Sequence, residues 1–182
     1  MKNLWKWVVM DDLIKDYIDQ YEKAISSIDQ IHGIGRRSVE SIVSEIGLDM
    51  SRFPTDSHLC SWAGVCPGNH QSAGKQKSGR ITKGNKALKD TLVQCAKAAR
   101  NVKDSFFSAQ YQKIAARRGK NRATVAVAHS MLIAIYHMLK DNVPYRDLGA
   151  DYYNHFNHEH KINACLKRLN VLGWSPEITP VS

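Results

Sequence analysis

A stretch near the middle of the chain contains the residues best suited to chemistry on a phosphate. It runs Cys66-Pro67-Gly68-Asn69-His70-Gln71-Ser72-Ala73-Gly74-Lys75, and further cations follow at Lys77 and Arg80. A serine hydroxyl becomes a nucleophile when its proton is removed or the departing charge is stabilised. Lysine and arginine can hold a phosphodiester and neutralise charge that develops during its transfer. By residue type alone, a loop serine more commonly hydrogen-bonds its own backbone, so Ser72 is a candidate only.

A second candidate site is the pair of glycines in Ile31-His32-Gly33-Ile34-Gly35. Two glycines between helices allow a tight turn with positive φ. They also leave N–H groups free at the start of the next helix, where an anion is favoured. Arg36 and Arg37 follow directly. With a helix on each side, the element resembles a helix-hairpin-helix, which grips a DNA phosphate without reading bases. A plain interhelical turn is the alternative.

Cysteine and histidine do not form a recognisable metal motif in this sequence. Structural zinc sites use paired ligands at short spacings, and the groups present here lack that pattern. We therefore expect no metal site and a buried thiol at Cys60. The groups considered are Cys60, Cys66 and His70, and His155, His158 and His160.

The positive charge of the chain is concentrated in one region. The formal net charge is +9, but residues 68–122 alone hold fourteen Lys or Arg against two acids, Asp90 and Asp104. Such asymmetry indicates a polyanionic ligand, with a solvated basic face as the alternative. Nucleic acid is the leading partner. No run of eighteen apolar residues occurs, so we expect no membrane partner. Irregularly spaced cysteines favour reduced thiols and a cytoplasmic location.

Helical periodicity dominates the chain and predicts an all-α fold. Glycine and proline interrupt it between residues 64 and 83, where we expect a long Gly-rich basic loop with room for a short hairpin. The stretch 122–140 is apolar over a wide arc and is the expected core helix, ended by Pro144. The expected helices cover residues 11–31, 36–46, 56–63, 85–100, 105–118, 122–140 and 152–169.

Three regions follow from this pattern. Residues 1–30 are expected to form an N-terminal helical arm, a possible coiled coil. Residues 31–145 are expected to form the helical domain that contains the helix-hairpin-helix and the basic loop. Residues 146–182 are expected to be a C-terminal helical extension and tail.

Several short motifs occur in an order that resembles a known family. They are Ile31-His32-Gly33-Ile34-Gly35, Ser44-Glu45-Ile46-Gly47, Arg52-Phe53, Trp62-Ala63-Gly64-Val65-Cys66-Pro67-Gly68, Gln71-Ser72-Ala73-Gly74-Lys75 and Gly79-Arg80-Ile81-Thr82-Lys83-Gly84-Asn85. Together they resemble the C-terminal domain of the Piv-related insertion-sequence transposases, the IS-one-ten group. The resemblance runs from about Gln30 to Tyr145, and the order of the motifs is far more specific than any single glycine pair.

The resemblance implies a recombinase that moves an insertion sequence by DNA transposition. It implies that Ser72, in the family's Ser-x-Gly element, is the nucleophile that becomes covalently linked to DNA; Ser78, before Gly79, is the competing alignment. It further implies an element-encoded guide RNA and a RuvC-like domain whose carboxylates bind a divalent metal, expected to be magnesium. We expect DNA as partner, together with that domain or a full-length transposase.

This sequence departs from the family in one respect. The family's RuvC-like domain precedes the helical arm, and nothing in this chain corresponds to it. The acids before residue 30 follow a helical pattern and lack the strands that such a carboxylate site needs. Two-metal chemistry therefore cannot be assembled from this chain alone. We expect a fragment, a truncated product or half of a split element, inactive by itself and without a cofactor of its own.

Two other interpretations stay open. The chain could be a non-catalytic helix-hairpin-helix module that binds DNA or RNA, as a transposase remnant would. It could also be a helical partner protein that forms a homo-oligomer through residues 11–31. The residues expected to contact nucleic acid are Gly33, Gly35, Arg36, Arg37, Lys75, Lys77, Arg80, Lys83 and Lys86.

Overall fold

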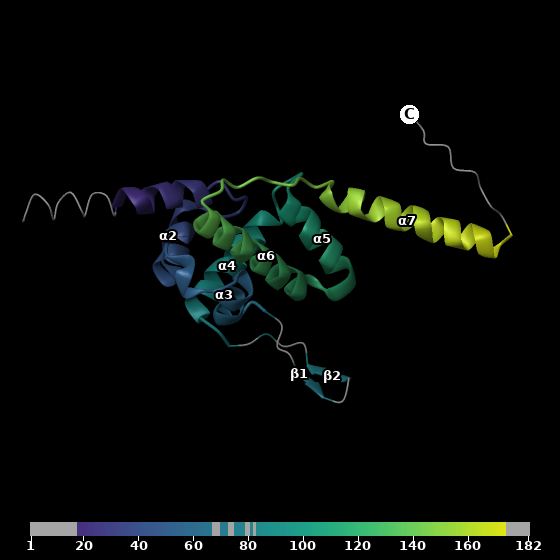
Figure 1. Cartoon of the computed structure of the whole chain (residues 1–182), viewed down its shortest axis with the longest axis horizontal. Coiled ribbons are helices and arrows are strands. Elements are labelled where there is room, and N and C mark those ends of the chain that lie inside the picture. The colour runs from purple at the N-terminus through teal and green to yellow at the C-terminus, as the bar shows by residue number, and fades with distance from the viewer. Residues whose placement is uncertain (1–17, 67–69, 73–74, 79–80, 82, 174–182) are drawn as a thin grey trace, which may run out of the picture.

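Helices pack around one long central helix, and a short hairpin and a final helix project from this core (Figure 1). The computed structural model describes residues 18–66, 70–72, 75–78, 81 and 83–173. The predicted all-α class is confirmed, with one two-stranded antiparallel hairpin added to it. After a helix over residues 18–28, the elements are α2 (Arg36–Ile46), η1 (Met50–Arg52), α3 (Asp56–Ala63), β1 (His70–Ser72), β2 (Lys75–Ser78), α4 (Lys86–Ala99), α5 (Phe106–Arg118), α6 (Lys120–Asp141) and α7 (Tyr152–Val171).

Short polar side chains set the starts of three helices. The side chains of Thr55, Asn85 and Ser105 accept hydrogen bonds from backbone N–H groups in the first turns of α3, α4 and α5. Such caps satisfy donors that the helix itself leaves free. The predicted starts of these helices are therefore confirmed to within one residue.

The central helix, α6, is the core helix that the apolar pattern predicts. It lies against α3, α4, α5 and η1. By length and composition it could also cross a membrane, but the same properties belong to the core helix of a folded domain, which α6 is here. Its buried residues are Ala123, Thr124, Val127, Ala128, Met131, Leu132, Ile135, Tyr136 and Met138.

The end of α6 lies within one residue of the predicted Lys140, but proline does not cause it. The helix stops at Asp141, and Asn142 adopts a left-handed conformation with φ of 52°. Asparagine tolerates this conformation and commonly ends helices in this way. Pro144 lies beyond that point, so the expectation that proline ends the helix is wrong.

The helix of residues 18–28 belongs partly to the core. Ile25 and Ile28 are buried together with Ile31 and Ile34, which follow the helix at the same three-residue spacing. Ile18, at the other end, is 57% exposed. Residues 11–17 of the expected helix lie outside the described residues. The second half of the arm therefore packs with the domain that follows it.

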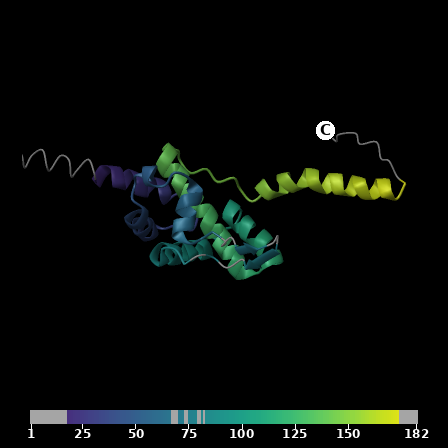
Figure 2. The same ribbon diagram turned by 60° about the horizontal axis from the view of Figure 1, so that its bottom comes forward.

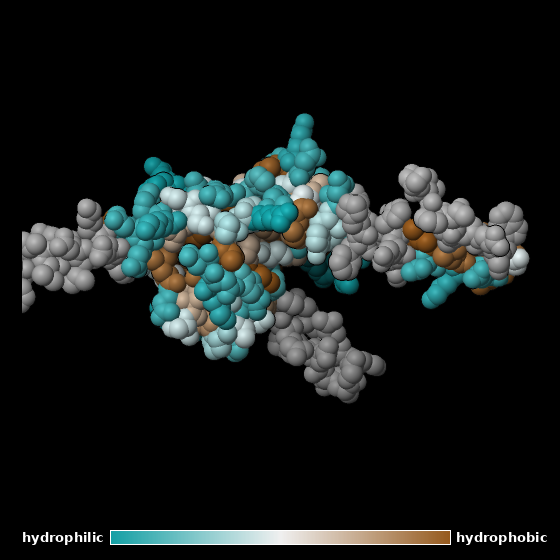
Figure 3. All heavy atoms as spheres, turned by 45° about the horizontal axis from the view of Figure 1, so that its top comes forward, coloured by the Kyte–Doolittle hydropathy of each residue, from teal (hydrophilic) through white to brown (hydrophobic). Residues whose placement is uncertain are grey.

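The last helix, α7, projects from the core in both ribbon views (Figures 1 and 2). Within the described part of the chain, its contacts with other elements are chiefly with α5. Apolar side chains such as Ile162 and Val171 are exposed along it, and hydrophobic atoms show there between hydrophilic ones in Figure 3. The predicted C-terminal helical extension is therefore present as a largely solvent-facing helix.

Candidate nucleic-acid interface

The loop that contains Ser72 leaves the core through a narrow neck formed by two glycines. A Cβ atom on Gly84 would lie 2.3 Å from the backbone nitrogen of Gly64, and one on Gly64 would lie 2.8 Å from the Cα of Gly84. Both glycines have positive φ, +73° for Gly64 and +50° for Gly84. Only residues without a side chain allow two backbones to approach this closely. The two ends of the loop are thereby held against each other.

Asn85 ties this neck to three helices. Its backbone N–H donates to the Trp62 carbonyl of α3 at 3.0 Å. Its side-chain oxygen caps α4 by accepting from the Leu88 N–H at 3.1 Å. Its side-chain nitrogen donates to Glu45 Oε2 of α2 at 2.7 Å. One residue thus satisfies a helix start and fixes the relative positions of α2, α3 and α4 at the base of the loop.

Beyond the neck, the chain forms a hairpin of two short strands. β1 and β2 pair antiparallel, with Ser72 opposite Lys75 and a register shift between His70 and Gln71. The hairpin expected as a possibility in this loop is present. For Ser72, Lys75 and Lys77 the structure describes the backbone path but not the side chains.

Of the other loop residues expected at the interface, some lie at the neck and the others lie outside the described residues. Gly74 and Arg80 lie outside the described residues. Lys83 and Lys86 are exposed on either side of the neck, and the Lys83 carbonyl accepts a hydrogen bond from Lys89 Nζ at 3.1 Å. The neck therefore presents cations to solvent at the point where the hairpin leaves the core.

The two glycines of the first turn differ in their roles. Gly33 has φ of +88°, and a Cβ there would lie 2.5 Å from the backbone nitrogen of Ala99 at the end of α4. Gly33 therefore allows both the turn and its close packing on α4. Gly35 precedes α2 with an ordinary extended conformation and open space around it. The expectation of positive φ is met at Gly33 and not at Gly35.

The two arginines after this turn are not equivalent. Arg36 donates to both carboxylate oxygens of Glu22, at 2.7 and 2.8 Å, and to Glu40 at 3.1 Å. The hydrogen bonds from Arg36 lower the pKa of Glu22. Arg37 is exposed and makes no ion pair within the described part of the chain. Arg36 therefore already binds acids of its own protein, whereas Arg37 is available to a ligand.

The turn that contains Gly33 also contacts the segment after α6. The sequence did not predict this contact. His32 Nδ1 lies 2.6 Å from Asp147 Oδ2, and the ring of His32 meets that of Tyr145 edge-on. The other carboxylate oxygen of Asp147 accepts from the N–H groups of Phe106 and Gly149, at 3.0 and 2.8 Å. Burial raises the pKa of Tyr145, with a smaller effect from Asp147. The segment after α6 thus helps to hold the turn and the start of α5.

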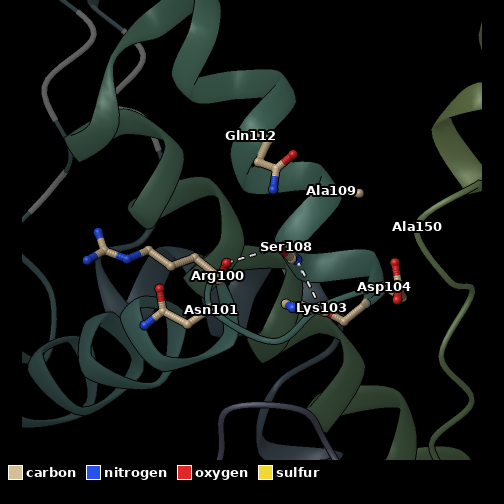
Figure 4. Close-up of a pocket in the computed structure, with 9 residues that line it drawn as sticks. Arg100, Asn101, Lys103, Asp104, Ser108, Ala109, Gln112 and Ala150 are labelled. Atoms are coloured by element: carbon tan, nitrogen blue, oxygen red, sulfur yellow. Dashed lines mark hydrogen bonds between the residues drawn. The ribbon is translucent and has the colours of Figure 1, made fainter.

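A polar hollow of about 350 Å³ lies where α4 meets α5 (Figure 4). Arg100, Lys103 and Asp104 line it, and Asp104 has φ of +57°. The Ser108 hydroxyl donates to the Arg100 carbonyl at 3.0 Å across its floor. The sequence does not predict this hollow, because only the chain reversal between the helices brings its residues together.

Metal-binding groups do not gather in the part of the chain that the structure describes. There, no three His, Cys, Asp or Glu side chains could hold an ion together. Cys60 is buried as predicted, and burial raises its pKa to about 12, with a smaller effect from Cys66. The described residues therefore do not fit a divalent metal.

The sequence is similar to those of known transposases. Residues 26–112 match the model of the transposase IS116/IS110/IS902 family. The transposase for insertion sequence element IS1111A of Coxiella burnetii is 29% identical over 146 residues, which cover 75% of this chain and 40% of that protein. A probable family 20 transposase of Pseudomonas aeruginosa is 28% identical over 120 residues, which cover 64% of this chain and 35% of that protein. The chain thus spans less than half the length of either relative.

Proposed function

Because the chain belongs to the IS116/IS110/IS902 family of transposases, we propose that it is the DNA-binding, serine-bearing part of an enzyme that moves an insertion sequence. One observation supports this most directly. The Ser72 hairpin lies within the matched residues 26–112, and its neck is closed by Gly64 and Gly84 against the helical core. A neck that holds the two ends of the loop together would limit the positions that its serine can reach. Strand transfer at one particular phosphate requires such restraint of the nucleophile.

In the proposed reaction, the Ser72 hydroxyl oxygen attacks a phosphorus atom of the DNA backbone. One bridging P–O bond breaks, the released strand end takes up the proton, and a serine phosphodiester forms. Attack by another DNA hydroxyl then frees the serine and joins the new strands. Lys75, Lys77, Arg80 and Lys83 would hold the phosphate and offset the developing charge.

The carboxylates for the rest of the chemistry would come from a RuvC-like domain or a full-length transposase as partner. Magnesium would be the metal of that domain. A structured RNA encoded by the element and a second copy of the chain are further proposed partners. The described cysteines are all free thiols, which suits a cytoplasmic protein.

Covalent capture of DNA tests the nucleophile. The chain is supplied with the carboxylate-bearing domain of its transposase and labelled element-end DNA, and protein–DNA adducts are resolved under denaturing conditions. We expect Ser72→Ala to abolish the adduct. Ser78→Ala, on the opposite strand of the same hairpin, is the matched control and should keep it. An adduct in the Ser72→Ala protein would contradict the assignment.

A binding module without chemistry is the second candidate, favoured by the lack of a carboxylate cluster within the described residues. It predicts DNA binding that weakens steeply with salt, because each neutralised phosphate releases counterions. Charge reversal at Lys75, Lys77 and Lys83 should weaken binding to every DNA sequence alike. Both candidates predict DNA binding, but only the serine-bearing enzyme part predicts a covalent protein–DNA adduct. The capture experiment therefore separates them.

A further inference from the structure

The turn between α5 and α6 concentrates positive charge away from the Ser72 hairpin and the Gly33 turn. Four cations occur within six residues, and all four are exposed. The sequence contains no Asp or Glu between Asp104 and Asp141, so neither α5 nor the first six turns of α6 supply a compensating acid. We call this cluster the α5–α6 cation turn; its members are Arg117, Arg118, Lys120 and Arg122.

Three cations elsewhere in the described chain contact groups of the protein itself. Arg36 is held by two glutamates, Arg100 lies over the ring of Tyr111, and Lys113 lies over the ring of Tyr153. The charged side chains of the α5–α6 cation turn make no hydrogen bond, ion pair or ring contact with the residues that the structure describes. Its charges are therefore free to meet a ligand.

The placement of two of these cations, Lys120 and Arg122, also costs stability. Lys120 and Arg122 lie in the first turn of α6, a helix of 22 residues with no acid in its first turn and no side-chain cap. The N-terminal end of a helix is itself positive, so cations there are disfavoured. Arg117 and Arg118 lie in the last turn of α5, where the helix dipole favours cations, but they place like charges next to Lys120 and Arg122. An arrangement that works against folding is expected where function requires it.

The position of the turn fits a contact near the hairpin. In both ribbon views, the α5–α6 turn lies toward the same end of the core as β1 and β2, and away from the helix of residues 18–28 (Figures 1 and 2). We propose that the α5–α6 cation turn is a second phosphate-binding surface, which holds duplex DNA beside the segment bound at the Ser72 hairpin.

The chemistry of the turn favours the backbone of a duplex. Its sequence, Arg117-Arg118-Gly119-Lys120-Asn121-Arg122, contains no aromatic residue. Proteins that bind single strands stack bases on aromatic side chains, which this turn cannot do. Arginine and lysine instead contact phosphates and fix register without reading sequence. The choice of DNA rests on the proposed function, whereas the site itself rests on the unpaired cations.

Paired neutralising variants test the proposal. Arg117→Gln/Arg118→Gln and Lys120→Gln/Arg122→Gln each remove two charges from the turn. Lys167→Gln/Arg168→Gln, on the exposed helix α7, removes two charges elsewhere and is the matched control. Lys75→Gln/Lys77→Gln probes the hairpin separately. Binding of a short mixed-sequence DNA duplex is measured by fluorescence anisotropy over a series of salt concentrations, and thermal unfolding is followed in parallel.

We expect each turn variant to flatten the plot of log affinity against log salt by about 2, because each phosphate contact contributes about 0.9 to its slope. The α7 control should leave the slope unchanged. We also expect Lys120→Gln/Arg122→Gln to melt at an equal or higher temperature while binding more weakly. If these cations had only a structural role, the substitutions would lower the melting temperature and the DNA affinity together.

Three outcomes are decisive. Turn variants that bind like the α7 control overturn the proposal, whatever the hairpin variant does. If the turn variants lose affinity and the hairpin variant does not, the second surface stands and the assignment of the hairpin lysines to DNA fails. If binding of a structured RNA of equal length falls while duplex DNA binding does not, the surface belongs to RNA and the proposal is wrong.

Discussion

The backbones of Gly64 and Gly84 cross so closely that a Cβ atom on Gly84 would lie 2.3 Å from the Gly64 nitrogen. We expect Gly84→Ala to destabilise the protein by about 2–4 kcal/mol, because the methyl group forces backbone apart and φ is positive. The neck should also open, so a protease should cut between residues 64 and 84 faster than in the unchanged protein. Urea unfolding and limited proteolysis measure the two effects.

Gly149→Ala separates the clash from the conformational strain. Gly149 also has a positive φ, +73°, but nothing lies within 4 Å of a Cβ placed there. Strain alone should cost about 1–2 kcal/mol and leave cleavage in the loop unchanged. Equal losses of stability in Gly84→Ala and Gly149→Ala would show that the crossing at the neck is not tight.

The hydrogen bond from Asn85 to Glu45 can be reversed by two substitutions. Asn85→Asp keeps the oxygen that caps α4 but sets a second carboxylate against Glu45 Oε2, now 2.7 Å from the Asn85 nitrogen. We expect a loss of about 1–3 kcal/mol, despite the gain from a negative charge at a helix start. Adding Glu45→Gln supplies a new donor and should recover most of the loss.

A double-mutant cycle in urea measures this coupling. Glu45→Gln alone should change stability little, because its amide oxygen still accepts from Asn85. If the double variant is only as stable as the two separate losses imply, the bond does not hold the neck to α2.

Local sequence signals were sufficient to predict the helices and the core. Thr55, Asn85 and Ser105 mark helix starts through bonds within their own first turn, and the apolar arc of residues 122–140 identified α6. The end of α6 was predicted to within one residue but assigned to Pro144, whereas Asn142 leaves the helix first in a left-handed conformation. Asn142 was the nearer signal, because asparagine commonly adopts this conformation at a helix end.

The site was predictable only in part, because its parts come together through contacts between distant residues. The Gly-rich loop was evident, but the crossing of Gly64 and Gly84 depends on how α3 and α4 pack. His32 and Asp147 are 115 positions apart, and no spacing rule joins them. The paired state of Arg36 likewise required knowing where Glu22 falls on the helix before the turn.

His129 should make the stability of the protein depend on pH. Burial lowers its pKa, and the nearby Asp56 opposes this effect only in part. The folded pKa therefore lies below the unfolded value of about 6.5, so the unfolded state binds more protons between the two values. The contribution of the neutral imidazole to the free energy of unfolding is therefore complete above pH of about 6.5. It is lost as the pH falls through the folded pKa. His129→Gln should reduce this loss.

The test for His129 compares two unfolding series. Free energies of unfolding are measured for the unchanged protein and for His129→Gln from neutral pH to roughly pH 5, the range in which a free histidine becomes charged. The difference between the two proteins should change with pH. A difference that stays constant across the range would show that His129 is not held neutral by burial.

The four cysteines should react with a thiol reagent in a fixed order. Cys165 is exposed on α7, Cys60 and Cys95 are buried, and Cys66 is intermediate. Burial raises the pKa of Cys60, Cys66 and Cys95, to about 12 for Cys60, and the thiolate is the reactive form. With Ellman's reagent near neutral pH, we expect one fast thiol in the folded protein and the remaining three only after denaturation. Cys165→Ser should remove the fast phase and leave the three thiols that react only after denaturation. Any fast thiol that remains in this variant would mean that the packing around α3 is looser than described.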